Sequence, residues 1–179
     1  ILREIARLER IIQDLLRVTH PQELMLTDTS ISDVIENSLK SLGPTMSRKP
    51  VSLELQLSGE IPLVAMDADQ MQQVFINLVK NAIDAVESDG RICIEAHSEE
   101  GTLDQGAVLK VSVTDSGCGI ESENLERIFE PFFTTKLDGT GLGLYVSYNI
   151  VRRHDGEISV SSEVGRGTTF CVELPVTRG

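Results

Sequence analysis

The chain has 179 residues, enough for one sizeable hydrophobic core, and its 40% apolar and 25% charged residues are ordinary for a globular protein. A net charge of −12 argues against a surface that binds nucleic acid, because phosphate backbones require clustered Lys and Arg. No apolar run approaches the ~20 residues of a membrane span, and three cysteines without a CxxC spacing indicate a reduced, cytoplasmic setting, so no membrane contact is expected for this segment.

The first 21 residues predict a helix that needs a partner. Its apolar residues repeat at intervals of four and three, as in a heptad seam: Ile1, Ile5, Leu8, Ile12 and Leu15. Because such a helix cannot bury its apolar face alone, we expect a homodimeric parent protein of which this chain is a part. The alternative is a helix that packs on its own domain. Pro21 ends the segment, and residues 22–29 are expected to form a linker.

From residue 30 onward, helical and strand patterns alternate. Ser30 begins a helix in the manner of a capping box, and residues 51–57 alternate between apolar and polar, as in a half-buried strand. The later predicted elements are a helix at Asp69–Val86, strands at Arg91–His97 and Ala107–Thr114, helices at about 121–129 and at Gly143–Arg153, and a hairpin of Glu157–Ser162 and Thr168–Leu174. This mixture predicts an α+β fold, a two-layer sandwich of one mixed, mostly antiparallel sheet with helices on one face.

The helix predicted at Asp69–Val86 carries two asparagines on one side. Asn77 and Asn81 are four residues apart and therefore project from the same face, with Lys80 and Asp84 beside them. A polar stripe is ordinary on an amphipathic helix, although Asn is only a middling helix former. An amide oxygen is also a suitable ligand for Mg²⁺ whose other ligands are phosphates and water. A solvated face and a metal ligand are both compatible with this pattern.

Two glycine-containing turns could hold a nucleotide. Asp115-Ser-Gly-Cys-Gly119 follows an apolar strand, and a carboxylate there can accept from the exocyclic amine of adenine, whereas guanine has a carbonyl at that position. A plain Asp-Ser-Gly turn is the alternative. Gly139-Thr-Gly-Leu-Gly143 leads into a helix, whose N-terminal N–H groups and partial positive charge favour phosphate, although a flexible loop is equally compatible with it.

Five short segments occur in a fixed order: Asn77-Leu-Val-Lys-Asn81, Asp115-Ser-Gly-Cys-Gly119, Phe129-Glu-Pro-Phe-Phe133, Gly139-Thr-Gly-Leu-Gly143 and Gly165-Arg-Gly-Thr168. Together they resemble the N, G1, F, G2 and G3 boxes of the ATP-binding domain of sensor histidine kinases, a fold shared with gyrase and mismatch-repair ATPases. The resemblance implies that residues 30–179 form the catalytic ATP-binding domain. It also implies that residues 1–21 form the second helix of the dimerisation and histidine-phosphotransfer hairpin, with 22–29 as the linker.

The resemblance implies roles for individual residues. Asn81 coordinates Mg²⁺, and Asp115 accepts from the adenine amine. Asn77 lies beside the phosphates and, with Lys80, forms the catalytic pair, while Lys136 is a further candidate for phosphate charge. The remaining implied ATP contacts are Gly117, Gly119, Ile120, Gly139, Thr140, Gly141, Leu142, Gly143, Leu144 and Thr168, with Phe132 and Phe133 at the border of a small mobile lid.

The implied function is to bind ATP with Mg²⁺ and to donate its γ-phosphoryl group to a histidine of the dimerisation domain, for relay to a response regulator receiver domain. That acceptor is absent from this sequence, because His20, His97 and His154 do not lie in an acceptor motif. An ATPase of the same fold and a nucleotide-sensing interaction module are the alternatives. ATPases of this fold typically place a water-activating Glu at the position of Asn77, and because an amide cannot accept a proton at neutral pH, Asn77 favours the kinase.

Overall fold

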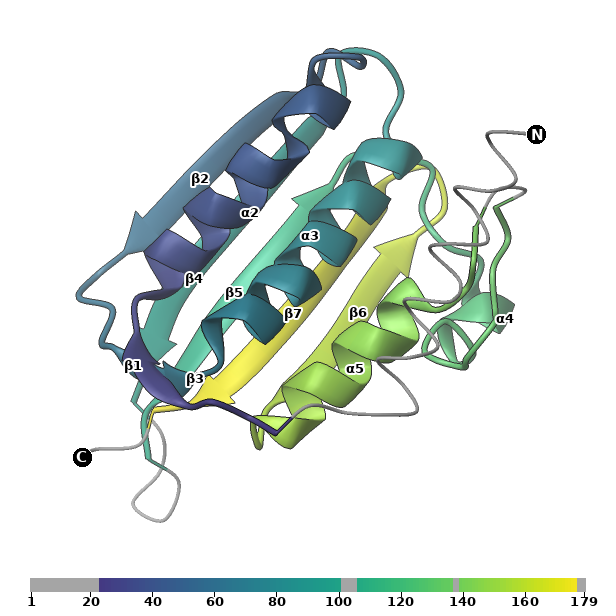
Figure 1. Cartoon of the computed structure of the whole chain (residues 1–179). Coiled ribbons are helices and arrows are strands. Elements are labelled where there is room, and N and C mark those ends of the chain that lie inside the picture. Colours follow the sequence, from purple (N-terminus) through teal and green to yellow (C-terminus); the bar gives the residue numbers. More distant parts are fainter. Residues whose placement is uncertain (1–22, 101–105, 137–138, 177–179) are drawn as a thin grey trace.

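A five-stranded sheet forms the centre of the computed structural model, which describes residues 23–100, 106–136 and 139–176. The strands lie in the order β2-β4-β5-β7-β6 (Figure 1). They are β2 (Ser52–Ser58), β4 (Arg91–Glu99), β5 (Val108–Asp115), β7 (Gly167–Pro175) and β6 (Glu157–Glu163). Strands β2 and β4 pair in parallel, and the other neighbours are antiparallel. The helix predicted for residues 1–21, with its heptad seam, lies outside the described residues.

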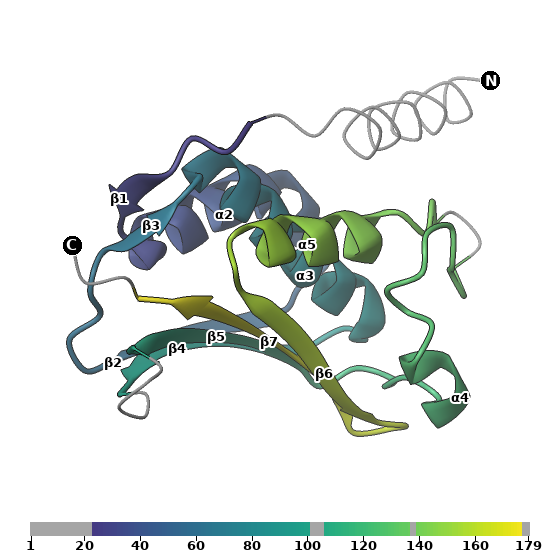
Figure 2. The same ribbon diagram turned by 90° about the horizontal axis from the view of Figure 1, so that it is seen from below.

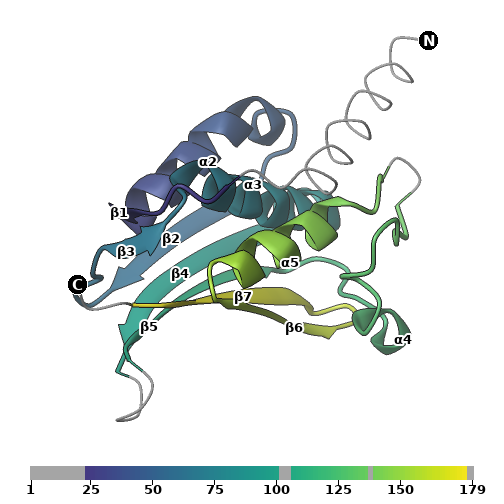
Figure 3. The same ribbon diagram turned by 60° about the horizontal axis from the view of Figure 1, so that its bottom comes forward.

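Three helices cover one face of this sheet, as Figures 2 and 3 show. They are α2 (Ile31–Met46), α3 (Ala68–Ala85) and α5 (Gly143–Arg153). Because side chains alternate across a strand, Leu109, Val111 and Val113 of β5 are buried in the same core as Phe75 of α3. The predicted two-layer α+β sandwich is confirmed. Within the described ranges, no helix is long and apolar enough to cross a membrane.

The helix predicted at about 121–129 is wrong over most of its length. Helix α4 spans only Ser122–Leu125. Beyond it, the N–H groups of Arg127 and Glu130 bond to carbonyls three residues earlier, as in successive tight turns. Ile128 is the one fully buried side chain of residues 121–129, so no apolar stripe holds a longer α-helix to the core.

The end of the predicted linker is a strand. Residues Thr27–Thr29 form β1, which pairs antiparallel with β3 (Val64–Met66) in a two-stranded sheet that the sequence pattern did not predict. Directly after β3, Asp67 caps the start of α3, because its carboxylate accepts the N–H of Gln70 at 3.1 Å. The same carboxylate accepts the N–H of Met25 at 3.1 Å, so the chain before β1 is fastened to the start of α3.

His154 connects this junction to the end of α5. Its Nε2 accepts the N–H of Asp67 at 3.0 Å, and Nδ1 is therefore the protonated nitrogen, which donates to the carbonyl of Ile150 at 2.8 Å. Burial acts to raise the pKa of Asp67, but hydrogen bonds from Gln70 and Met25 outweigh it and hold that pKa below its ordinary value. Asp67 and His154 therefore fix α3 and α5, the two helices that carry the candidate site, relative to each other.

Candidate nucleotide site

Asn77 joins the middle of α3 to the start of α5. Its Nδ2 donates to the carbonyl of Gly143 at 3.0 Å and to Ser147 Oγ at 3.2 Å, while its Oδ1 accepts from Gln73 Nε2 at 3.0 Å. Both ends of the amide are thus engaged, which fixes its orientation. The structure brings Asn77 to the glycine turn that the sequence assigned to phosphate; a contact between Asn77 and phosphate stays a prediction.

The start of α5 presents backbone rather than side chains. The first N–H groups of a helix have no intrahelical acceptor, and no side chain in the described part of the chain caps those of α5, so an anion can bind them. Gly141 has a φ of 68°, and a Cβ there would lie 2.6 Å from the carbonyl oxygen of Phe132, so only glycine fits. Leu142 is buried and Leu144 packs against the core, so these side chains anchor the turn.

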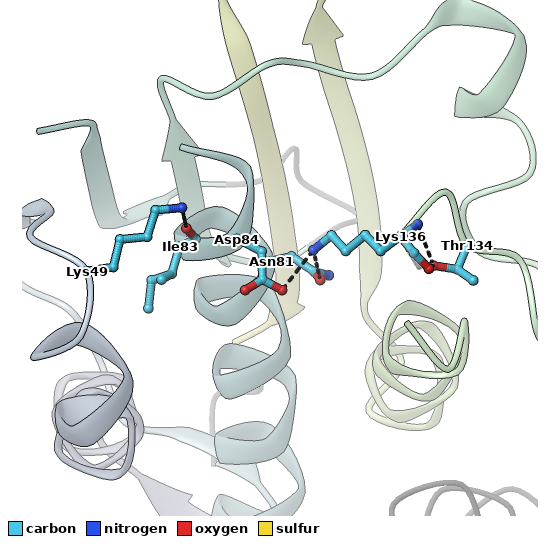
Figure 4. Close-up of polar contacts among 6 residues, drawn as sticks. All are labelled: Lys49, Asn81, Ile83, Asp84, Thr134 and Lys136. Atoms are coloured by element: carbon cyan, nitrogen blue, oxygen red, sulfur yellow. Dashed lines mark hydrogen bonds and ion pairs between the residues drawn. The ribbon is translucent and has the colours of Figure 1, made fainter. Parts of the chain in front are cut away.

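Asn81 lies one helical turn beyond Asn77 and faces a lysine from the segment between α4 and α5. Lys136 Nζ donates to Asn81 Oδ1 at 3.2 Å and to Asp84 Oδ2 at 3.0 Å, and Figure 4 shows the ammonium between these two side chains. The oxygen predicted to bind Mg²⁺ therefore accepts a hydrogen bond from Lys136 in this structure, and its role as a metal ligand stays a prediction. Lys80 is exposed and makes no hydrogen bond or ion pair with any other described residue, so the structure does not bring it into this group.

Asp115 lies at the end of β5 and is buried. Its Oδ1 accepts the N–H of Gly117 at 2.8 Å, and the backbone N–H of Thr168 also donates to the carboxylate. Burial raises the pKa of Asp115 above its ordinary value, although these two hydrogen bonds and the charge of Lys136 act in the opposite direction. Because two carboxylate oxygens offer about four lone pairs, this side chain can also accept from an amine of the ligand.

The turn after Asp115 depends on glycine because protein backbone approaches it closely. A Cβ on Gly117 would lie 2.6 Å from the carbonyl oxygen of Ala85 at the end of α3 and 2.7 Å from Asp115 Oδ1. Gly119 has a φ of 74°, and a Cβ there would overlap the carbonyl of Glu163. These glycines therefore let the turn pack between α3 and the β6–β7 hairpin.

Ser162 connects that turn to the hairpin. Its Oγ accepts the N–H of Ile120 at 2.8 Å, donates to the carbonyl of Gly167 at 2.9 Å and lies 2.9 Å from Thr168 Oγ1. A polar hollow at this end of the sheet has Asp115, Ser162 and Thr168 among its lining residues. Asp115, Ile120 and Thr168, three of the predicted ATP contacts, are thus brought together.

The aromatic segment divides into anchored and exposed rings. Phe129 packs against Phe170 of β7, with ring centroids 6.4 Å apart, and Phe133 lies under the guanidinium of Arg127 at 4.4 Å. Phe132 is 60% exposed and has a φ of 67°, which is strained backbone for an aromatic residue. Of these two residues, only Phe133 is partly packed against the core, and their place at the border of a mobile lid stays a prediction.

The sequence did not assign several residues that hold the site together. Ser147 and Ser162 are small polar residues on inward-facing positions of α5 and β6, and a polar residue within an apolar face is the signal that could have revealed them. Asp84 was placed on the Asn81 side of its helix but was given no role. Its partner Lys136 is 52 positions away in the sequence, so no local pattern indicates the ion pair.

Comparison with known proteins defines the family. The sequence model of the family described as histidine kinase-, DNA gyrase B- and HSP90-like ATPase matches residues 66–178, and the chain belongs to this family. It is 39% identical over 174 residues to the sensor histidine kinase ZraS of Escherichia coli (strain K12), a match that covers 97% of this chain and 36% of ZraS. The chain therefore spans about a third of the length of this relative.

Solved structures agree with this assignment. Full-length ShkA in complex with AMPPNP has a TM-score of 0.85 and 26% identity, with coverage of 99% of this chain and 38% of the ShkA chain. Histidine kinase ThkA in complex with the response regulator protein TrrA has a TM-score of 0.79 and 31% identity, over 97% of this chain and 48% of the ThkA chain. The resemblance inferred from the five segments is confirmed.

Proposed function

We propose that this chain is the catalytic ATP-binding part of a sensor histidine kinase, which binds Mg-ATP and donates the γ-phosphoryl group to a histidine of its dimerisation domain. In this proposal residues 1–21 are a helix of the dimerisation and phosphotransfer hairpin, 22–29 the linker and 30–179 the catalytic domain. The ATP analogue bound by ShkA supports the nucleotide, and the ThkA–TrrA complex supports relay to a response regulator.

The observation that carries the proposal is the fixed amide of Asn77. A hydrolytic ATPase needs a base that activates water, and an amide cannot accept a proton at neutral pH. Hydrogen bonds from Gln73 and to Gly143 hold this amide at both ends. Three carboxylates near the site are also engaged, Asp84 by Lys136, Glu163 by Arg166 and Asp115 by backbone N–H groups. The γ-phosphoryl group should therefore persist until a positioned imidazole attacks it.

Each part of the site has a task in this proposal. Asp115 accepts from the adenine amine, and the N–H groups at the start of α5, with Lys136, face the phosphates. Asn81 Oδ1 is a ligand of Mg²⁺, which when bound supplies charge neutralisation on the phosphates. The imidazole nitrogen forms a bond to the γ-phosphorus as the bond from that phosphorus to the β–γ bridging oxygen breaks, and ADP leaves. The protein contributes positioning and electrostatic stabilisation.

The test follows γ-labelled Mg-ATP with this chain in molar excess and measures bound nucleotide and released phosphate in the same sample. The kinase proposal predicts bound nucleotide with little release. Release of phosphate from most of the bound nucleotide would instead identify an ATPase with a base elsewhere. Tight binding with neither release nor transfer to any histidine-bearing hairpin would favour the nucleotide-sensing module.

A further inference from the structure

Lys136 is held at both its backbone and its ammonium. Its N–H donates to Thr134 Oγ1 at 3.1 Å, and its carbonyl accepts the N–H of Gly139 at 3.1 Å. Its Nζ bonds to Asp84 Oδ2 at 3.0 Å and to Asn81 Oδ1 at 3.2 Å (Figure 4). Because Asn81 and Asp84 are one turn apart on α3, the rigid helix decides where this flexible side chain ends.

The position of this ammonium matters because cations are scarce in the site. The chain has a net charge of −12, and a polyphosphate brings further negative charge that must be neutralised locally. Among the described residues, Lys80 faces the same side of α3 but is not drawn into the group.

We propose that Asp84 is a positioning residue for nucleotide binding, whose carboxylate holds the Lys136 ammonium beside the Asn81 amide oxygen, where it meets the phosphates of ATP. An ammonium has three N–H donors; when Asn81 Oδ1 binds Mg²⁺, the bond to Asp84 still holds the ammonium and leaves two donors for phosphate oxygens. Fixing the long Lys side chain in advance lowers the entropy lost on binding. Asp84 thus favours the binding of an anion although it is itself an anion. This inference rests on the proposed function.

A purely structural role for the ion pair would predict that removing it lowers the unfolding midpoint. The Asp84 and Lys136 side chains are each 41% exposed, and pairs with this exposure add little to folding stability. Removing the carboxylate should therefore leave the unfolding midpoint unchanged and act on ATP affinity alone. If Asp84 acted only by repelling the phosphates, its removal should strengthen ATP binding. The sign of the change in ATP affinity therefore separates charge repulsion from positioning of Lys136.

The experiment is a double-mutant cycle in which calorimetry measures Mg-ATP affinity for the whole chain. We expect Lys136→Met to weaken binding about tenfold and Asp84→Asn about threefold to fivefold. Asp84→Glu should restore affinity to within about twofold of the unsubstituted chain, and Asp84→Asn combined with Lys136→Met should bind no more weakly than Lys136→Met alone. Asp69→Asn removes the same charge from the exposed first turn of α3 and is the matched control, with affinity unchanged.

Three results would overturn the inference. Asp84→Asn could bind Mg-ATP as well as or better than the unsubstituted chain, Asp84→Asn could weaken binding by the same factor in the Lys136→Met background, or Lys136→Met could leave the affinity unchanged. In each case the unsubstituted chain still binds Mg-ATP and the proposed function stands. If the unsubstituted chain binds no Mg-ATP, the proposed function and the inference both fail.

Discussion

Replacing Asp115 by Asn tests the base pocket with the smallest change of shape. The substitution exchanges one carboxylate oxygen for an NH₂ group and removes the charge. The carboxylate accepts backbone N–H groups from Gly117 and Thr168, so the amide oxygen can satisfy one of these donors while the NH₂ group faces another donor. The adenine amine is itself a donor, and it therefore meets a pocket with fewer acceptors.

The expected loss follows from these hydrogen bonds. A hydrogen bond to a charged acceptor contributes about 1.5–3 kcal/mol, and a buried donor left without an acceptor costs about 1–3 kcal/mol more. A loss of roughly 3–5 kcal/mol corresponds to ATP affinity weakened by about 100-fold to a few thousand-fold. Isothermal titration calorimetry with Mg-ATP measures it, and Asp69→Asn serves as the charge-matched control on an exposed site.

The fold should not suffer from the same substitution. Because burial raises the pKa of Asp115, the native state disfavours the ionised carboxylate; this penalty is absent below the unfolded pKa, grows as the pH rises and is fully present above the folded pKa. A neutral Asn removes this penalty but leaves one backbone N–H facing its NH₂ group, at a cost of about 1–3 kcal/mol. Because the two effects oppose each other, the urea midpoint at pH 7 should change little and the variant should stay folded. An Asp115→Asn variant with near-native ATP affinity would refute the base-pocket assignment, and one that unfolds would refute the electrostatic reasoning.

Three further predictions concern the turn, the junction and the metal ligand. Gly119→Ala should lower the free energy of unfolding by more than the ~1 kcal/mol expected for Gly165→Ala, because both have positive φ but only Gly119 faces a carbonyl; equal losses in urea unfolding would contradict this. Asp67→Asn keeps a capping side chain but lacks the carboxyl group whose pKa is lowered in the native state. Its deficit in unfolding free energy should be present above pH ~4 and should vanish as the pH falls through the folded pKa of Asp67. A deficit that is the same at every pH would contradict the role of the ionised carboxylate. Asn81→Ala should weaken binding of Mg-ATP more than of metal-free ATP by calorimetry, and equal losses would remove its metal role.

Regular elements with a strong period were predictable from the sequence. Helix α5 has the predicted bounds Gly143–Arg153, and α3 differs from its prediction by one residue at each end. Strands β4 to β7 agree with their predicted bounds to within two residues at each end, because alternation against one covered face leaves a clear signal. The three-residue strands β1 and β3 are too short to show alternation, so their pairing could not be predicted.

The long-range polar contacts of the site escaped prediction for a different reason. His154 meets Asp67 across 87 residues, and Lys136 meets Asp84 across 52, so each pair depends on the packing of α3 against later parts of the chain. Motif spacing placed Asn77, Asn81 and Asp115 in the site region, but it gave no account of what orients them. Orientation comes from partners such as Ser147 and Ser162, which only the folded arrangement reveals.

The most direct test of the central claim is transfer of labelled phosphate to a histidine. A longer form of the protein that includes an upstream phosphotransfer helix with its histidine should be incubated with γ-labelled Mg-ATP, beside the same protein with Asp115→Asn. The proposed function predicts label on the longer protein that is lost in acid and retained in base, as a phosphorus–nitrogen bond requires, and none on the Asp115→Asn variant. A longer protein that binds ATP and stays unlabelled with its sensor input present would contradict the proposed function.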